Sequence, residues 1–73
     1  MAKSAITIRF GKTLREYREA KGYSQEELAE RADLHRNYVG SVERGERNVA
    51  LENIVKLAKA LSLPTRDLFK GLP

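Results

Sequence analysis

The chain has 73 residues, enough for one small domain that buries roughly 60% of the surface its unfolded chain exposes. Hydrophobic residues make up 41% and charged residues 33%, as in soluble globular proteins, and no apolar run approaches the roughly 18 residues of a membrane span. The absence of cysteine excludes disulfides and thiolate metal sites, and a net charge of +4 favours a polyanionic partner without establishing one. We therefore expect a cytoplasmic protein that is stabilised by helix packing.

Residues 1–7 show no apolar periodicity and are predicted to form a flexible arm. The next apolar side chains recur at helical spacing: Phe10, Leu14 and Tyr17. Because Gly22 ends this run, a first helix is expected over residues 8–21. Arg18 lies on the same apolar stripe, where a leucine would be typical. A half-buried arginine needs a carboxylate, so we expect an acidic partner for it.

A second helix begins after Ser24. Ser24 and Glu27 have the spacing of a capping box, and Tyr23 with Leu28 forms the matching hydrophobic staple. The spacing predicts a helix of about nine residues with one apolar stripe. Residues 24–34 include four acidic residues and one basic residue, whereas residues 1–23 include six basic and two acidic residues. This helix is therefore acidic and its flank is basic, although such charges can also serve only to solvate surface helices.

The third predicted helix begins near His35 and stops at Gly45, a residue that readily takes the positive φ of a helix end. Only Asp33 and Leu34 clearly connect it to the second helix, which favours a bend of three to four residues. Its inward apolar residues are Val39 and Val42. The remaining face is predicted to point outward, toward solvent or a partner, and carries Arg36, Asn37, Gly40, Ser41 and Arg44.

The downstream segment predicts the most apolar helix of the chain, from Leu51 to Leu61, and a final single turn from Thr65 to Phe69. The expected architecture is an all-α, compact domain of five helices. Apolar residues at this end exceed what one short helix buries: Val55, Leu61, Leu63, Leu68, Phe69 and Leu72. They form either an ordinary core that closes the domain or a two-fold dimer interface.

Several groups of residues together match a known pattern. They are Leu14 and Arg18 before Gly22, then Gln25, Glu27, Leu28 and Ala29, then Val42 to Gly45, and then Leu57 and Ala58 with Leu61. Residues 10–70 resemble the phage-repressor and Cro-type (Xre-like) helix-turn-helix family. Within it, Arg36, Tyr38 and residues 43–48 most resemble the controller proteins of restriction–modification systems. The resemblance implies a lambda-repressor-like fold and a single-domain, dimeric, DNA-binding protein.

The resemblance also implies roles for individual residues. Arg18 and Glu43 match a semi-buried ion pair that ties the first helix to the recognition helix. Arg36, Asn37 and Ser41 match positions that face base edges. Their chemistry is suitable, because arginine can bind guanine O6 and N7, asparagine can bind adenine N6 and N7, and serine can bind either.

Five further residues match positions that hold the DNA backbone: Gln25, Tyr38, Arg44, Arg47 and Asn48. Gln25 would use its amide together with the N–H groups at the start of the second helix to grip a phosphate. The alternatives are that Gln25 is a solvated first-turn residue and that Tyr38 simply packs. Contacts of this kind add affinity without sequence information.

Three positions depart from the family pattern. His35 stands where the family commonly has a serine or threonine cap, so the third helix has an uncertain start. Gly40 lies inside that helix, which costs about 0.5–1 kcal/mol relative to alanine. Ala50 replaces the usual polar cap before the fourth helix.

The leading interpretation is a sequence-specific regulator of transcription that binds double-stranded DNA as a homodimer. Two recognition helices about 34 Å apart would read a pseudo-palindromic operator. A contact with RNA polymerase is a further expected partnership. The alternative is an antitoxin-type protein that binds a partner toxin and regulates its own operon.

An enzyme is the least favoured class. The chain has one histidine, no cysteine, no glycine-rich phosphate loop and no carboxylate pair placed by a motif. We expect no catalytic residues, cofactor, metal, membrane contact or small-molecule substrate.

Overall fold

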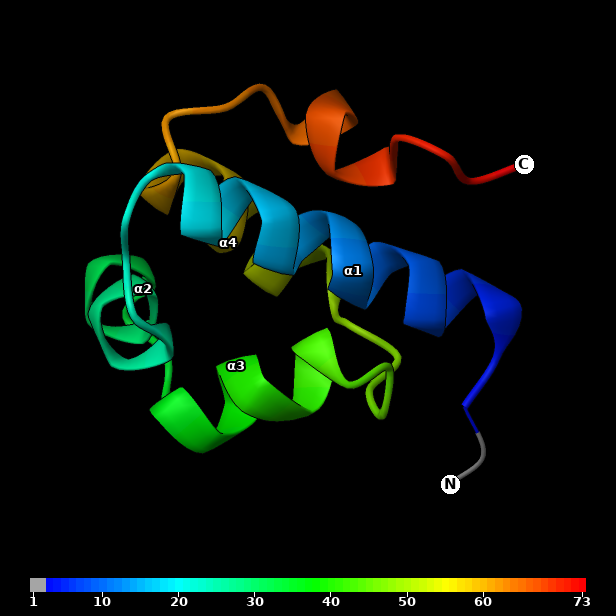
Figure 1. Cartoon of the computed structure of the whole chain (residues 1–73), viewed down its shortest axis with the longest axis horizontal. Coiled ribbons are helices and arrows are strands. Elements are labelled where there is room, and N and C mark those ends of the chain that lie inside the picture. Colours follow the sequence, from blue (N-terminus) through cyan, green and yellow to red (C-terminus); the bar gives the residue numbers. More distant parts are fainter. Residues whose placement is uncertain (1–2) are drawn as a thin grey trace.

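The computed structural model describes residues 3–73 and shows four α-helices followed by one 3₁₀-helix (Figure 1). The elements are α1 (Ala5–Ala20), α2 (Gln25–Ala32), α3 (Arg36–Glu43), α4 (Leu51–Ala60) and η1 (Thr65–Phe69). No strand and no helix long and apolar enough to cross a membrane occurs within these residues. The all-α prediction is confirmed. The prediction of five α-helices is not, because η1 is a 3₁₀-helix. Its hydrogen bonds join residues three apart, such as the Asp67 N–H and the Pro64 carbonyl.

The start of α1 differs from the prediction. Residues 5–7, which were predicted to belong to an arm, are helical because Ser4 caps the helix. The Ser4 hydroxyl accepts from the Thr7 N–H and the Thr7 hydroxyl accepts from the Ser4 N–H, both at 3.0 Å. Apolar periodicity does not indicate this first turn, because its Ile6 side chain is exposed and does not continue the buried stripe of α1. Met1 and Ala2, which also belong to the predicted arm, lie outside the described residues.

Of the two hydrogen bonds of the predicted capping box at the start of α2, the structure has one. The Ser24 hydroxyl accepts from the Glu27 N–H at 3.0 Å, as the spacing predicts. The Glu27 carboxylate was expected to reach back to Ser24, but it pairs with Arg31 at 3.1 Å, one helical turn further along. The helix ends at Asp33, whose φ of 58° lies in the left-handed region.

Three residues, Asp33 to His35, join α2 to α3, which confirms the predicted bend. His35 resolves the uncertain start of α3, because it is the cap residue and its ring nitrogen Nδ1 accepts from the Asn37 N–H at 3.0 Å. At the other end, Gly45 has a φ of 78°, as the sequence predicts. Ala50 caps α4 without a side-chain hydrogen bond.

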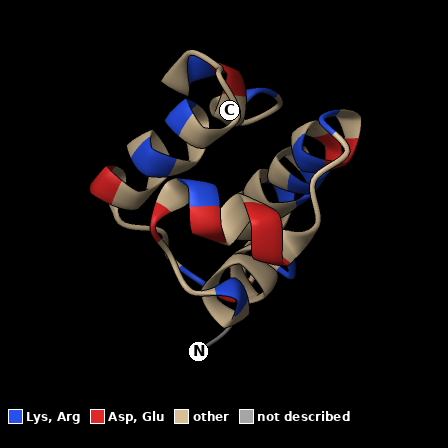
Figure 2. Cartoon of the chain, turned by 90° about the vertical axis from the view of Figure 1, so that its left-hand side faces the viewer, with Lys and Arg blue, Asp and Glu red and all other residues tan. Residues whose placement is uncertain are grey.

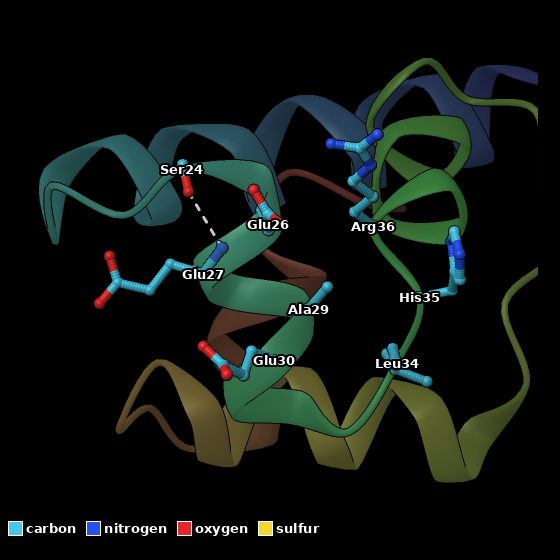
Figure 3. A pocket seen from close by; sticks show the side chains of 8 residues that line it. All are labelled: Ser24, Glu26, Glu27, Ala29, Glu30, Leu34, His35 and Arg36. Carbon is cyan, nitrogen blue, oxygen red and sulfur yellow. Dashed lines mark hydrogen bonds between the residues drawn. The ribbon is translucent and has the colours of Figure 1, made fainter.

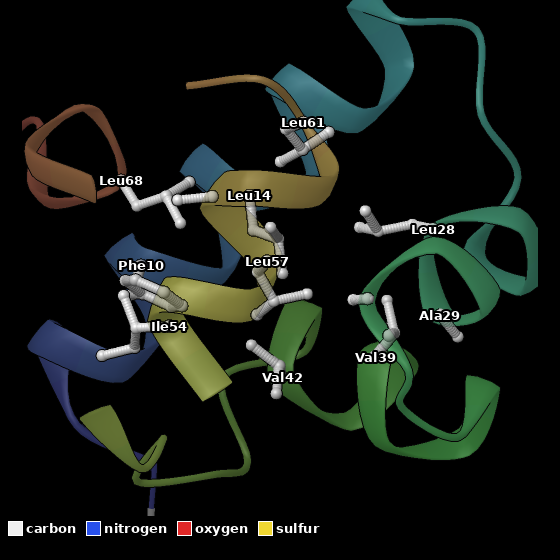
Figure 4. Packing of buried hydrophobic residues seen from close by; sticks show 12 residues of the cluster. Phe10, Leu14, Leu28, Ala29, Val39, Val42, Ile54, Leu57, Leu61 and Leu68 are labelled. Carbon is white, nitrogen blue, oxygen red and sulfur yellow. The ribbon is translucent and has the colours of Figure 1, made fainter. Parts of the chain in front are cut away.

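One apolar core joins all five elements (Figure 4). Five leucines are fully buried in it: Leu14, Leu28, Leu57, Leu61 and Leu68. The prediction that Leu61 and Leu68 belong to a dimer interface is therefore wrong. The chain after α4 folds back so that η1 packs against α1 and α4, and the Phe10 and Phe69 rings lie 6.2 Å apart between their centres.

The first helix lies directly on the C-terminal half of α3, which extends along the lower side of the molecule in Figure 1. A Cβ atom added to Gly11 would stand 2.5 Å from the Glu43 carbonyl oxygen, so only glycine allows this approach. The Thr7 hydroxyl donates to the Gly45 carbonyl at 2.8 Å. These backbone contacts fix the direction of α3 relative to the rest of the domain.

Candidate nucleic-acid interface

A buried ion pair joins α1 to α3. Arg18 Nε lies 2.6 Å from Glu43 Oε2, and Arg18 Nη2 lies 3.1 Å from Glu43 Oε1. Only 11% of the Arg18 side chain and 3% of the Glu43 side chain are exposed. The hydrogen bond from Arg18 to Glu43 raises the pKa of Arg18 against the opposing effect of burial. The predicted pairing is confirmed, and it accounts for an arginine on an apolar stripe.

Glu43 also binds α2. The Gln25 amide donates from Nε2 to Glu43 Oε1 at 3.0 Å, so one carboxylate contacts side chains from both α1 and α2. The sequence predicts a phosphate contact for Gln25. It does not indicate the bond to Glu43, because 18 residues separate the two positions. An amide nitrogen has two N–H groups, which leaves Gln25 one further donor. Its side chain is thereby oriented before any ligand arrives.

A shallow polar depression lies next to this ion pair. Its lining residues come from α2 and α3, and they are Gln25, Arg36, Asn37, Gly40 and Arg44. A Cβ atom on Gly40 would stand 3.2 Å from Arg44 Nη1 and 3.3 Å from Gln25 Oε1. Glycine therefore keeps the floor of the depression open. Of the predicted DNA contacts, the structure brings Gln25, Arg36, Asn37 and Arg44 together here.

The acidic face of α2 borders this surface. Figure 2, viewed from the side of α2, shows acidic positions on the helix that faces the viewer. In Figure 3, Glu26 on α2 and Arg36 on α3 stand on opposite sides of a second hollow, which also includes Glu30. Arg36 lines both hollows, so it stands where the acidic surface gives way to the depression.

Ser41 is not where the sequence predicted. It was expected on the outward face as a base-reading residue, but only 5% of it is exposed. Its hydroxyl donates to the Tyr38 carbonyl at 2.7 Å and accepts from Arg47 Nε at 3.0 Å. The segment after Gly45 folds back over α3 and covers Ser41, which no local pattern indicates. The prediction that Ser41 lies on the outward face is wrong.

Tyr38 and Arg47 pack together beside Ser41. The Arg47 guanidinium carbon lies 5.6 Å from the centre of the Tyr38 ring, and Arg47 stays exposed. The half-buried Tyr38 accepts at its hydroxyl from Asn53 Nδ2 at 3.1 Å. Sequence reasoning missed Asn53, because a partner 15 residues away leaves no periodic signal. Asn48 is exposed next to Arg47.

Arg44 has an acidic partner that the sequence did not predict. Arg44 Nε donates to Glu46 Oε2 at 3.0 Å and Arg44 Nη2 donates to Glu46 Oε1 at 3.2 Å. The hydrogen bond raises the pKa of Arg44 and lowers that of Glu46, because it favours the charged form of each group. Side chains three or four residues apart face each other on a helix, but no such rule applies to two residues that follow a helix end. The sequence therefore does not indicate Glu46 as the partner of Arg44.

Two short helices joined by a three-residue turn, with α1 and α4 packed behind them, define a helix-turn-helix domain. The family model described as helix-turn-helix matches residues 14–68, and the chain belongs to this family.

Relatives and solved structures of this kind agree with the architecture. The control protein C.BamHI of Bacillus amyloliquefaciens is 48% identical over 64 residues, which cover 86% of this chain and 79% of that protein. The control protein C.MunI of Mycoplasma sp is 41% identical over 68 residues and 92% of both chains. The crystal structure of the restriction–modification controller protein C.AhdI from Aeromonas hydrophila is similar to this fold, with a TM-score of 0.89. The sequences of the two chains are 57% identical, and the match covers 90% of this chain and 100% of that chain.

Proposed function

We propose that this protein is a sequence-specific, double-stranded-DNA-binding regulator of transcription, which acts as the controller of a restriction–modification system. The observation that carries the proposal is the polar depression in which Gln25, Arg36, Asn37 and Arg44 meet at the exposed side of α3. Its side chains are the types that bind phosphates and base edges. The relatives that are named control proteins support the same class.

Within this proposal, α3 enters the major groove and its N-terminal residues Arg36 and Asn37 contact base edges. Both side chains are exposed. Gln25 donates to a phosphate with the amide that Glu43 orients, and Arg44, Arg47, Asn48 and Tyr38 follow the backbone. Ser41 is left out, because its hydroxyl is buried and bound to Arg47.

The protein acts as a homodimer on a pseudo-palindromic operator. Four of the predicted interface residues are at least partly exposed and remain in the proposal: Val55, Leu63, Phe69 and Leu72. Leu51, one helical turn before Val55 on α4, is 70% exposed, and we add it to the proposed interface. Removing such a surface from water favours pairing of two copies. Two recognition helices about 34 Å apart would then reach successive major grooves.

A contact with RNA polymerase belongs to the same proposal, since a regulator bound beside a promoter lies next to the polymerase. In an in vitro transcription assay, the operator placed upstream of a promoter should make transcript yield depend on this protein. A contact is supported if activation is lost when the operator is displaced by half a helical turn.

Selection of bound DNA from a random pool tests the proposed function. The expected result is an enriched pseudo-palindrome whose half-site centres lie about 10 base pairs apart. Enrichment of no sequence above the starting pool would overturn the proposal. The antitoxin alternative predicts instead a neighbouring gene for a small toxin and a stable complex with its product, whereas a controller predicts a neighbouring methyltransferase or endonuclease gene.

A further inference from the structure

Of the four ion pairs among residues 3–73, the Arg44–Glu46 pair is the one whose arginine lines the polar depression. In the Arg15–Glu19 and Arg31–Glu27 pairs, the two residues lie one helical turn apart, on the surface of α1 and of α2 respectively. Arg44 directly follows α3 as its C-terminal cap, and Glu46 follows the Gly45 turn. The backbone turn therefore brings a carboxylate to the surface that we propose to face DNA phosphates.

The geometry of the pair decides which part of Arg44 stays available. Glu46 occupies the edge formed by Nε and Nη2, at 3.0 and 3.2 Å. Nη1 points toward Gly40, where an added Cβ atom would lie 3.2 Å away. The guanidinium is a rigid planar fork, so fixing one edge fixes the direction of the other. Arg44 thus presents Nη1 to the depression instead of sweeping across the surface.

This arrangement affects two kinds of DNA complex differently. On arbitrary DNA, a freely rotating arginine can reach whichever phosphate is nearest, because backbone contacts carry no sequence information. A held arginine binds only a partner that stands where Nη1 points. The Glu46 side chain is also 41% exposed, and its negative charge repels the phosphates of either kind of DNA, which lowers both affinities without changing their ratio.

We propose that Glu46 is a specificity-determining residue, which holds Arg44 in one direction and lowers the affinity for arbitrary DNA more than the affinity for the operator. This inference rests on the proposed function. Glu46 acts through Arg44, and the quantity it sets is the ratio of operator affinity to random-DNA affinity.

The test compares Glu46→Gln with wild type on the selected operator and on random DNA of equal length. Glu46→Gln should raise the affinity for random DNA about two- to fivefold, the range expected for releasing an exposed ion pair, and raise operator affinity less. The slope of log affinity against log salt on random DNA should steepen by about one. Since 58% of the Arg44 side chain and 41% of the Glu46 side chain are exposed, the variant should have the same melting temperature as wild type.

Glu19→Gln is the matched control. It makes the same charge change in a surface pair of similar length, 3.1 Å, that lies on α1 outside the depression. It should leave the affinity ratio unchanged. In an Arg44→Ala background, Glu46→Gln should have no more effect on the ratio than Glu19→Gln has.

The inference is overturned if Glu46→Gln changes both affinities by one factor, or if it does no more than Glu19→Gln. A wild-type protein that fails to distinguish operator from random DNA contradicts the proposed function itself. Discrimination by wild type with an unchanged ratio in Glu46→Gln contradicts only the role of Glu46.

Discussion

Glu43 accepts hydrogen bonds from Arg18 and Gln25, so one buried carboxylate links α1, α2 and α3. Burial makes such a charge costly unless its partners are in place. The partners here also position a side chain of the proposed DNA surface. Stability and binding are therefore coupled at this residue, and a change there should affect both.

Glu43→Gln removes the charge and keeps the shape. The Arg18 guanidinium, whose side chain is only 11% exposed, would lose its counter-charge. We expect the free energy of unfolding to fall by about 3 kcal/mol, the lower end of the range for breaking a buried pair. Urea denaturation measures the change. Glu19→Gln, in an exposed pair, should cost under about 1 kcal/mol. Equal losses in the two variants would contradict a buried-pair role for Glu43.

Arg36→Ala tests base reading. The exposed Arg36 side chain should contribute about 1–3 kcal/mol of discrimination at one position in each half-site, so its removal should relax the preference there. Binding to a panel of operators with single base changes measures it. Arg47→Ala is the comparison, because a lost phosphate contact should weaken binding to all sequences alike and reduce the salt slope by about one. An equal loss for Arg36→Ala on operator and random DNA would refute its assignment.

At the scale of elements, the direction of α3 follows from close backbone contact with α1. The contact occurs at Gly11, and the Thr7 hydroxyl adds a bond to the carbonyl that follows α3, that of Gly45. The three-residue turn on the other side determines the angle between α2 and α3. The eight-residue helix α3, which we propose to read DNA, is thus held at both ends by neighbouring elements.

Gly11→Ala should destabilise the domain although alanine favours helices. Its Cβ atom would meet the backbone of α3 at 2.5 Å from the Glu43 carbonyl oxygen, and overpacking of this kind costs about 1–3 kcal/mol. Thermal unfolding measures the loss. Gly40→Ala is the control, since outside the backbone of α3 its Cβ atom would come closest to side-chain ends, those of the exposed Arg44 at 3.2 Å and of Gln25 at 3.3 Å. A stability gain in Gly11→Ala of the size that helix propensity predicts would show that α1 can shift away from α3.

At the scale of the whole molecule, the domain has two different surfaces. The polar depression lies between α2 and α3, and the partly exposed apolar residues lie on α4 and the C-terminal segment. The core between them is shared by all five elements. A dimer formed through the apolar surface leaves both depressions free, which is what binding to two half-sites requires.

Leu51→Glu tests the dimer without threatening the fold, because Leu51 is 70% exposed. In sedimentation at micromolar concentrations, we expect the variant to be a monomer where wild type is a dimer. The variant should also bind the operator more weakly, because its two copies no longer bind the two half-sites as one linked unit. Unfolding should be unchanged. Ile8→Glu is the control, because it makes the same kind of change at an exposed apolar residue of α1 that is not part of the proposed interface. A wild-type protein that stays monomeric at these concentrations removes the homodimer from the proposal.

Local patterns predicted most of the fold. Apolar spacing and the Ser24 cap located α2, and Gly45 located the end of α3, because these signals lie within one or two turns of the residues they govern. The Arg18–Glu43 pair was also predicted, from an arginine out of place on an apolar stripe and the family resemblance. The start of α1 was missed, since a serine–threonine cap stands before residues that show no apolar period.

Local sequence patterns indicate the helices, their order, the family and the residue types available to bind DNA, because these depend on neighbours along the chain. Tertiary structure decided which side chains face outward. It buried Ser41 under Arg47, placed Leu61 and Leu68 in the core and brought Glu46 against Arg44. Each outcome depends on a segment folding back after a turn, and the spacing of residues along one helix contains no information about what another segment covers.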